Sequence, residues 1–272
     1  MTSATSTIHP RALIHPNAQI GEGTIIGPDV VIDEHVEIGE NCEVRARAII
    51  TGHTKVGAGN QIGYGAIVGA EPQDLAYKPC QSFTSIGDNN IIREYVTVHR
   101  GTKEGSSTSI GNHNYLMTGV HIAHNCQIGN FIILVNNVLL GGYVEVKDFA
   151  FLGGGSVVHQ FTRVGEHVMV RGQTRLGLDV PPYFMAVATN AVCGLNRVGL
   201  KRKGFDAARR THIMDAYKIL YYEGKNRQQA LETIRARPEL QNEDIELLCR
   251  FVEQTKRGIC RAVKSGDIEE LG

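Results

Sequence analysis

The chain has 272 residues, its 28 Lys and Arg are balanced by 28 Asp and Glu, and 42% of its residues are hydrophobic. This balance excludes the basic excess that is typical of nucleic-acid-binding proteins, and no apolar run approaches the roughly 20 residues needed to span a bilayer. Residues 1–7 are polar and lack the layout of a signal peptide. We therefore expect a cytoplasmic protein with no nucleic-acid partner and no stable membrane insertion.

Residues 8–176 carry an aliphatic residue at every sixth position, in three blocks. The first block runs from Ile8 to Val68, the second from Ile86 to Val98, and the third from Ile110 to Leu176. A helix repeats at 3.6 residues and a strand at 2, so a period of six fits short strands with a corner in every repeat. We predict a mainly β fold, a parallel β-helix whose three-sided coils stack and bury one aliphatic residue on each side.

Two polar segments interrupt the repeat, near residues 71–84 and 101–109. We predict that they form loops expelled from the wall of the β-helix. A regular wall of short strands has few places for chemistry, whereas loops commonly carry binding residues. We therefore expect substrates to bind beside these two loops.

The repeat ends after Leu176, where residues 179–183 contain two prolines that cannot join a strand ladder. Beyond Gly204 the apolar residues follow a helical spacing. Three helices are expected, marked by Ile213, Tyr217 and Leu220, by Leu231 and Ile234, and by Ile245, Leu248, Phe251 and Val252, with Asn242 as the cap of the third. We predict a β-helix over residues 1–189 and a small C-terminal α-helical domain over 190–272 that covers the open end of the coil.

Histidines gather in and near the third block, at His99, His113, His121, His124, His159 and His167. Ile122 belongs to the six-residue repeat and points inward, so His121 and His124 cannot both lie in the core. From spacing alone three interpretations stay open: solvated surface histidines, a zinc site, or a general base. The zinc sites of β-helical carbonic anhydrases use an H-x-x-x-x-H pair, whereas only two residues separate His121 from His124, so we predict no metal.

Six short motifs occur in order along the chain. They are EPQDL at 71–75, VTVHRG at 96–101, HIAHNC at 121–126, VHQF at 158–161, DVPPY at 179–183 and GLKRKGF at 199–205. Together they resemble the acyl-[acyl-carrier-protein]–UDP-N-acetylglucosamine O-acyltransferase family, and the resemblance covers essentially the whole chain. It implies that the coil of the β-helix is left-handed.

The resemblance also implies an activity, which is the first step of lipid A biosynthesis. An R-3-hydroxyacyl group passes from acyl carrier protein to the 3-hydroxyl of UDP-N-acetylglucosamine. The acyl donor is carried on the phosphopantetheine of the carrier protein, so no cofactor of the enzyme's own is expected. Members of the family are homotrimers with active sites between subunits.

The family's residue roles carry over by motif match. Three residues would be catalytic: His124 as the general base, Gly142 through a backbone N–H that binds the oxyanion, and Asn125 as the residue that orients His124. A larger set would bind substrates. Gln73 and Asp74 would contact the sugar or the acyl 3-hydroxyl, His99, His121, Tyr143, His159 and Gln160 would line the cleft, Asn196 would bind the nucleotide, Arg202 and Lys203 would meet a phosphate or the acidic carrier protein, and Gly172 would leave room for a longer acyl chain.

Four residues depart from the family pattern. Ala76 replaces a Lys, which Lys78 would have to compensate, Asn125 replaces an Asp, Tyr143 replaces a His, and Val198 replaces a Glu. These changes bear on acceptor binding more than on the type of reaction. Three other functions stay open: acylation of a 2-amine in the next step of the pathway, a zinc carbonic anhydrase, and a non-catalytic scaffold. The sequence also leaves open the acyl length and whether the acceptor carries a 3-hydroxyl or a 3-amine.

Overall fold

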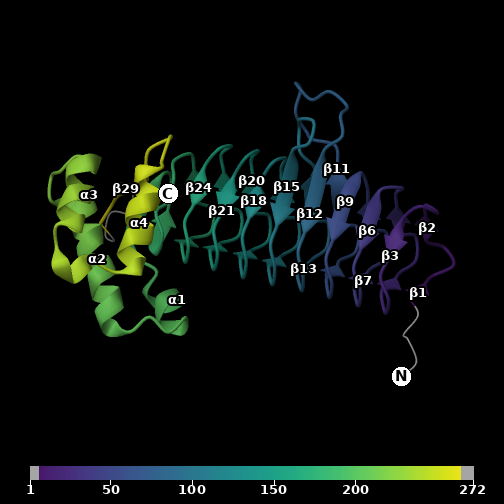
Figure 1. The fold of residues 1–272 in the computed structure, drawn as a ribbon, viewed down its shortest axis with the longest axis horizontal. Coiled ribbons are helices and arrows are strands. Elements are labelled where there is room, and N and C mark those ends of the chain that lie inside the picture. The colour runs from purple at the N-terminus through teal and green to yellow at the C-terminus, as the bar shows by residue number, and fades with distance from the viewer. Residues whose placement is uncertain (1–5, 265–272) are drawn as a thin grey trace.

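The computed structural model describes residues 6–264, and a three-sided prism of stacked coils forms most of it (Figure 1). The chain passes in turn through three sheets, here called A, B and C. Strands three apart in the sequence pair in parallel: His121 and Ile122 lie beside Leu139 and Leu140 of the next coil. This is the parallel β-helix predicted from the six-residue repeat.

The strands of all three sheets are short. Sheet A contains β1 (Thr7–Ile8), β4 (Ile25–Ile26), β7 (Glu43–Val44), β10 (Gln61–Ile62), β13 (Ile91–Ile92), β16 (Tyr115–Leu116), β19 (Ile133–Leu134), β22 (Phe151–Leu152), β25 (Met169–Val170), β27 (Phe184–Val187), β28 (Ala191–Leu195) and β29 (Arg261–Ala262). Sheet B contains β2 (Leu13–Ile14), β5 (Val31–Ile32), β8 (Ile49–Ile50), β11 (Ile67–Ala70), β14 (Thr97–His99), β17 (His121–Ile122), β20 (Leu139–Leu140), β23 (Val157–Val158) and β26 (Arg175–Leu176). Sheet C contains β3 (Gln19–Ile20), β6 (Val36–Ile38), β9 (His53–Val56), β12 (Phe83–Ile86), β15 (Ser107–Ile110), β18 (Gln127–Ile128), β21 (Glu145–Val146) and β24 (Arg163–Val164).

The residues of the six-residue repeat form the core of the prism. Each of them from Ile26 to Leu176 is at most 3% exposed, because successive residues of a strand point to opposite faces of its sheet. Ile8 differs and is 47% exposed, because it lies in the first coil and no earlier coil covers it. The apolar column therefore begins one coil inside the N-terminal end of the prism.

Three corners join the sheets, and each is named here by the two sheets that it connects. Corner AB includes residues 135–137, 153–155 and 171–173, corner BC includes 123–125, 141–143 and 159–161, and corner CA includes 129–131, 147–149 and 165–167. At corner BC, Asn125, Tyr143 and Phe161 adopt the left-handed backbone conformation, with φ of 60°, 60° and 65°. The stacked rings of Tyr143 and Phe161, 5.0 Å apart, offset the strain that such residues carry there.

Two loops leave the prism from sheet B at corner BC (Figure 1). The first, here called loop 1, covers residues 71–82 between β11 and β12, and the second, loop 2, covers residues 100–106 between β14 and β15. Strand β12 begins at Phe83 and β15 at Ser107, so each strand starts inside the segment expected to be loop. Both loops therefore project over the same edge of the prism.

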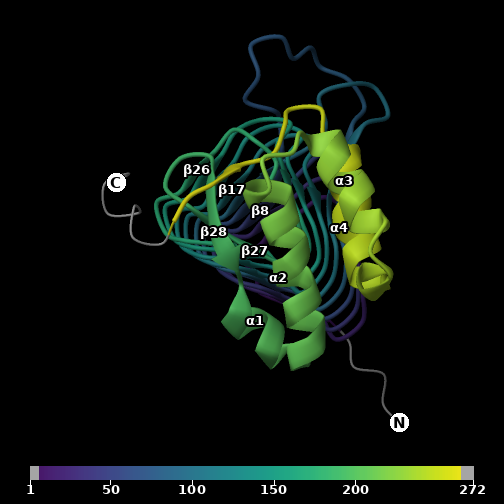
Figure 2. The same cartoon turned by 90° about the vertical axis from the view of Figure 1, so that its left-hand side faces the viewer.

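The C-terminal region contains α1 (Arg197–Arg202), α2 (Ala207–Tyr222), α3 (Arg227–Arg235), the 3-10 helix η1 (Pro238–Leu240) and α4 (Glu243–Glu253). Helices α2, α3 and α4 carry the residues expected for three helices, whereas α1 was not predicted. Figure 2 shows α2 in front of the end of the coil. The expected domain boundary at 189/190 falls in the turn between β27 and β28, which pair antiparallel within sheet A. Residues 265–272 of the expected helical domain lie outside the described residues.

Asp179 links the last coil to the segment that follows α4. It is 1% exposed, and its carboxylate accepts hydrogen bonds from the Arg163 N–H at 2.9 Å and the Thr255 hydroxyl at 2.7 Å. These bonds fix the chain where it leaves the regular repeat. No helix within residues 6–264 has both the length and the apolar character needed to cross a membrane.

Candidate active site

A cavity of about 560 Å³ lies on sheet B beside corner BC, under loop 1. Seven of the residues singled out in the sequence line it: Gln73, Asp74, His121, His124, Gly142, His159 and Gln160. They come from loop 1 and from three successive coils, and the parallel stacking of these coils brings them together. Apolar residues of the wall, including Leu139 and Val157, complete the lining.

His124 is the histidine with the best-defined surroundings. Its side chain is nearly buried, and its Nδ1 lies 3.1 Å from Oδ1 of Asn125. The same Oδ1 accepts the backbone N–H of Thr102 at 3.1 Å, which identifies it as the oxygen of the amide. We therefore assign the ring proton to Nδ1. The lone pair of Nε2 faces the cavity, 3.9 Å from Oδ2 of Asp74.

Gly142 lies on the coil after His124, against its ring. The backbone N–H of Tyr143 donates to the carbonyl of His124 at 3.0 Å, which holds the two coils in register. The N–H of Gly142 has no acceptor among residues 6–264. Gly142, whose N–H has no partner among these residues, therefore lies directly against the ring of His124, so close that an added Cβ would meet Nε2 at 2.6 Å.

His99 and His121 form a second pair of imidazoles on sheet B. Their rings meet edge to face at 5.1 Å, and Nδ1 of His121 lies 2.7 Å from the Thr97 hydroxyl. Burial, and then the neighbouring His121, lower the pKa of His99 to about 4, and burial also lowers the pKa of His121. Both rings are therefore neutral near pH 7. His99 does not line the cavity and instead packs behind His121.

Arg100 anchors loop 1 and was not singled out from the sequence. Its guanidinium donates to the carbonyl of Gly69 at 3.0 Å and to the Tyr77 hydroxyl at 3.3 Å, and it forms an ion pair with Glu71 at 3.0 Å. Its position directly after His99, within the motif VTVHRG, could have indicated that Arg100 is a functional residue. Lys78, the expected substitute for the missing Lys, is exposed and does not line the cavity.

Six other predicted residues lie outside the cavity. Asn196 is the N-cap of α1: its Oδ1 accepts the Gly199 N–H at 3.0 Å, while its Nδ2 donates to the carbonyl of His167 at 2.9 Å. Lys203 lies over the ring of Phe149, 4.4 Å from its centroid. Helix α1 is on the opposite edge of the prism from loops 1 and 2 (Figure 1). The remaining four are Asn125, Tyr143, Gly172 and Arg202.

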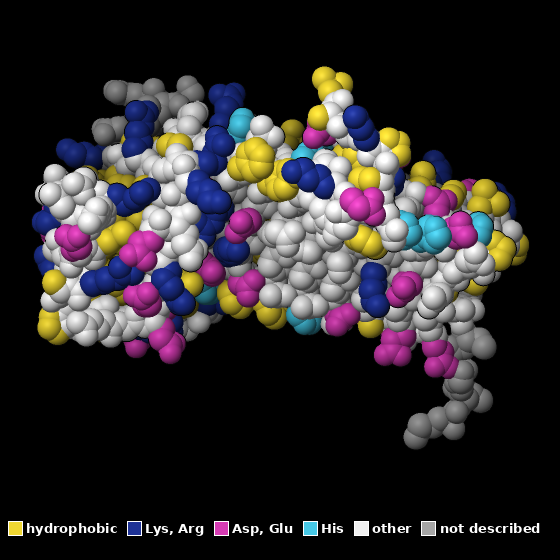
Figure 3. All heavy atoms as spheres, turned by 45° about the horizontal axis from the view of Figure 1, so that its top comes forward, with side chains coloured by type: hydrophobic (Ala, Val, Ile, Leu, Met, Phe, Trp, Pro, Cys, Tyr) yellow, Lys and Arg dark blue, Asp and Glu magenta, His cyan; other side chains and the backbone are white. Residues whose placement is uncertain are grey.

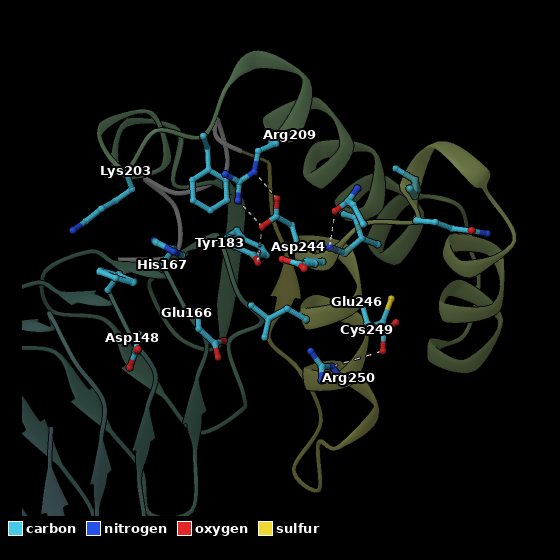
Figure 4. A pocket seen from close by; sticks show the side chains of 18 of the residues that line it. Asp148, Glu166, His167, Tyr183, Lys203, Arg209, Asp244, Glu246, Cys249 and Arg250 are labelled. Carbon is cyan, nitrogen blue, oxygen red and sulfur yellow. Dashed lines mark hydrogen bonds and ion pairs between the residues drawn. The ribbon is translucent and has the colours of Figure 1, made fainter.

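Three larger cavities lie beside the helical region. One, of about 1090 Å³, separates corner CA from α4 (Figure 4), and within it Arg209 pairs with Asp244 at 2.8 Å. The second, of about 1010 Å³, lies between sheet C and α4, and the third, of about 770 Å³, is lined by residues of α1 and α2. None of the three contains His121 or His124. Within residues 6–264 no group of three or more His, Cys, Asp or Glu side chains is placed to hold a metal ion.

Comparison with known proteins gives consistent matches. Residues 179–260 match the family model described as UDP N-acetylglucosamine O-acyltransferase, domain 2, and residues 8–102 match the GMPPB C-terminal domain. The chain is 44% identical over 217 residues to the acyl-[acyl-carrier-protein]–UDP-N-acetylglucosamine O-acyltransferase of Syntrophobacter fumaroxidans, covering 79% of this chain and 84% of that protein. It is 52% identical over 219 residues to the protein of the same name from Psychromonas ingrahamii, covering 78% and 82%.

Solved structures of proteins with the same activity in their names are also similar to this chain. The UDP-N-acetylglucosamine acyltransferase of Francisella novicida superposes with a TM-score of 0.89 at 40% identity, covering 96% of each chain. The Arabidopsis UDP-N-acetylglucosamine acyltransferase superposes with a TM-score of 0.83 at 32% identity, covering 93% of this chain and all of that one. The similarity therefore includes the prism, both loops and the helical region.

Proposed function

Because this chain belongs to the acyl-[acyl-carrier-protein]–UDP-N-acetylglucosamine O-acyltransferase family, we propose that it transfers an R-3-hydroxyacyl group from acyl carrier protein to the 3-hydroxyl of UDP-N-acetylglucosamine, the first step of lipid A biosynthesis. It is an O-acyltransferase with the left-handed parallel β-helix of that family. One observation carries the mechanism: Nε2 of His124 faces the cavity and its ring lies against Gly142, whose N–H has no acceptor within residues 6–264.

His124 acts as the general base. Its Nε2 removes the proton of the sugar hydroxyl while that oxygen forms a bond to the thioester carbon. A base placed in this way contributes about 10²–10⁴-fold to the rate. Asn125 accepts the Nδ1–H and so keeps the lone pair on Nε2. When the tetrahedral intermediate collapses, the C–S bond breaks and the proton passes from His124 to the leaving thiol.

Gly142 stabilises the charge that develops during the reaction. The thioester oxygen becomes an oxyanion as the carbon turns tetrahedral, and a backbone N–H without another acceptor is suited to bind it. One such donor is worth roughly 10²–10³-fold. The contact between Gly142 and the His124 ring supports a mechanism in which the base and the oxyanion donor act on the same thioester group.

The other residues of the cavity hold the two substrates. Asp74 and Gln73 reach the site from loop 1 and form hydrogen bonds with the sugar or with the acyl 3-hydroxyl. The Asp74 carboxylate accepts such bonds, and the Gln73 amide can accept or donate them. His121, His159 and Gln160 come from the wall. Since burial keeps His121 neutral, it contributes a hydrogen bond rather than a charge.

The acyl chain runs across sheet B, from corner BC to corner AB. Leu139 and Val157 point outward from this sheet and are each 42% exposed, which gives the path an apolar surface. Gly172 lies at the far corner, on the exposed surface. Without a side chain there, the path stays open to a longer chain.

The protein acts as a homotrimer, because two of its three sheets present apolar faces. Outward residues of sheet A include Ile91, Tyr115, Ile133, Phe151 and Met169, and those of sheet B include Ile67, Leu139 and Val157. Those of sheet C are polar or charged: Lys55, Ser109, Gln127, Glu145 and Arg163. Sheet A of one copy packing on sheet B of the next closes a ring of three, which buries both apolar faces and leaves sheet C in solvent.

This arrangement explains why some predicted residues lie outside the cavity of their own chain. With corner AB at the three-fold axis, corner BC of each copy lies opposite corner CA of its neighbour. Lys203 lies over Phe149 at corner CA, and α1 follows the same edge of the prism. Asn196, Arg202 and Lys203 therefore complete the site of the adjacent subunit, where they meet the nucleotide and its phosphates.

The acyl carrier protein binds beside the helical region. Lys and Arg side chains form a band at the junction of the prism and the helices (Figure 3), and Lys147, Arg163, Arg250, Lys256 and Arg257 line the groove between sheet C and α4. Arg257 also approaches Nδ1 of His159 at 3.4 Å, so the band reaches the reaction cavity. An acidic carrier protein complements this surface.

All six cysteines are free, which fits the reducing cytoplasm.

An acyl-transfer assay tests the proposal. Purified protein is given acyl carrier proteins loaded with 3-hydroxyacyl chains of several lengths and acceptors with a 3-hydroxyl or a 3-amine. The 3-hydroxyl sugar should be acylated, and His124→Ala should lower kcat by at least about 10²-fold. Full activity of His124→Ala contradicts the mechanism, and transfer only to an amine contradicts the proposed acceptor.

A further inference from the structure

We propose that Thr102, in loop 2, is a positioning residue that holds the imidazole of His124 in its working form by orienting the amide of Asn125. The inference rests on the proposed role of His124 as the general base. It assigns loop 2 a task different from substrate binding, which is to keep the proton of His124 on Nδ1.

The side chain of Asn125 has two ends of almost the same shape, and only one of them suits His124. The oxygen accepts the Nδ1–H of His124, whereas the NH₂ group would donate toward Nδ1 and force the ring proton onto Nε2. A proton on Nε2 would remove the lone pair that faces the cavity. The orientation of one amide therefore decides whether His124 can act as a base.

Thr102 selects the productive orientation through two donors. Its backbone N–H lies 3.1 Å from Oδ1 of Asn125, and its hydroxyl donates to the same oxygen at 2.9 Å. A flipped amide would turn its NH₂ group toward both donors and lose both bonds. Because Asn125 is only 7% exposed, water cannot easily replace them.

Tyr143 closes the network around His124. The single hydrogen of the Thr102 hydroxyl is used on Asn125, so this hydroxyl accepts from the Tyr143 hydroxyl at 3.2 Å. The ring of Tyr143 meets the ring of His124 edge to face, 5.4 Å between centroids. Asn125 and Tyr143 occupy equivalent places of corner BC, both with φ of 60°, and both side chains contact Thr102 of loop 2.

The hydrogen bonds from Thr102 are required because residue 125 is an amide and not a carboxylate. A carboxylate at position 125 would present oxygen to His124 in either orientation, and no neighbour would have to choose between its ends. An amide presents oxygen in one orientation only. The two donors of Thr102 therefore matter because this chain carries Asn at 125.

A double-mutant cycle tests the inference with the intact protein. Thr102→Val removes the hydroxyl donor and keeps the size of the side chain, and it is made both in the wild type and in Asn125→Asp. With Asn at 125, kcat should fall about tenfold with KM unchanged, and Thr102→Ser should restore it. With Asp at 125, the same substitution should change kcat less than twofold. Equal losses in the two backgrounds, or no loss in either, would overturn the inference.

The tautomer of His124 gives a readout that does not depend on activity. Histidine-selective ¹⁵N labelling, with His124→Gln to assign the signal, should find the proton on Nδ1 in the wild type and a larger Nε2–H population in Thr102→Val. A wild-type ring protonated on Nε2 refutes the positioning role. Activity that survives in His124→Ala would instead refute the proposed general base, so the two failures can be told apart.

Discussion

A methyl group on Gly142 would lie 2.4 Å from Cε1 and 2.6 Å from Nε2 of His124. Non-bonded atoms normally stay about 3.5 Å apart or more, so any side chain at position 142 must push the imidazole aside. The backbone of one coil is therefore the surface on which the histidine of the preceding coil rests. The spacing between successive coils fixes the distance between them.

Gly142→Ala should lower kcat by about 10²–10³-fold, because the displaced ring loses its place beside the acceptor hydroxyl and the oxyanion donor. Steady-state kinetics with a check of oligomeric state measures this effect. Gly177→Ala is the matched control, since its new methyl would come no closer than 3.6 Å to any neighbour, at Oδ1 of Asn190. Near wild-type activity of Gly142→Ala would show that His124 does not work from the observed position.

Gly172→Met should shift acyl preference toward shorter chains, because its side chain would lie across the end of the path on sheet B. Each methylene is worth about 1–3 kcal/mol in such a site, so the preference should change at least tenfold. Competition between acyl carrier proteins loaded with different chains measures the ratio. An unchanged ratio would remove Gly172 from the determinants of chain length.

Phe151→Lys should break the trimer, because it puts a charge at the centre of the apolar face of sheet A. The variant should elute as a smaller species in light-scattering chromatography and should lose acyl transfer, since each site needs its neighbour. Ser85→Lys, at an exposed outward position of sheet C, should remain trimeric and active. A trimeric, active Phe151→Lys enzyme would mean that sheet A does not form the interface.

The burial of His99 should make the protein less stable in mild acid. Its pKa is about 4 in the folded state and about 6.5 in the unfolded chain. Between these values only the unfolded state binds the proton, so the free energy of unfolding falls as pH falls from 6.5 to 4, by about 3 kcal/mol for this residue. Urea denaturation at pH 7 and 4.5 should show a smaller loss in His99→Gln than in the wild type. The exposed His113→Gln should keep the wild-type loss, and equal losses in all three would contradict the prediction.

Asp179→Ala should cost about 3–5 kcal/mol of stability, because it leaves the Arg163 N–H and the Thr255 hydroxyl without acceptors in the interior. Chemical denaturation measures the loss. Asp215→Ala on α2 removes a surface ion pair with Lys218 and should cost about 1 kcal/mol or less. A similar cost for the two substitutions would show that Asp179 does not tie the last coil to the C-terminal segment.

The prism could be predicted from the sequence because burial in a coil imposes its own period. Every aliphatic residue of the repeat from Ile26 onward is in the core, and the failure at Ile8 has the same cause, since a first coil has no neighbour on one side. Helix α1 could not be predicted in this way. It spans six residues with one buried side chain, Leu200, which is too short for a helical period, and its start depends on the Asn196 cap.

The site could be predicted in part for a related reason. His124, Asn125 and Gly142 lie in or beside the repeat, so their stacking follows from a separation of about 18 residues. The contact of Thr102 with Asn125 could not be predicted. Thr102 lies in loop 2, which is irregular, so no repeat in the sequence indicates which residue it contacts. The roles of Asn196, Arg202 and Lys203 stay predictions, because these residues lie outside the cavity of their own chain and reach it only in the proposed trimer.

Loop 1 begins and ends in strands that keep their places in the stack: β11 pairs with β14 directly, and β12 pairs with β9. The length of loop 1 can therefore change without shifting the register of the coils. Lengthening the loop adds an entropic cost that grows only slowly with its length. The part of loop 1 after the EPQDL motif, residues 76–82, can therefore change in length while the wall that carries His124 stays the same. The reach of the loop and the catalytic wall can in this way evolve separately within one chain.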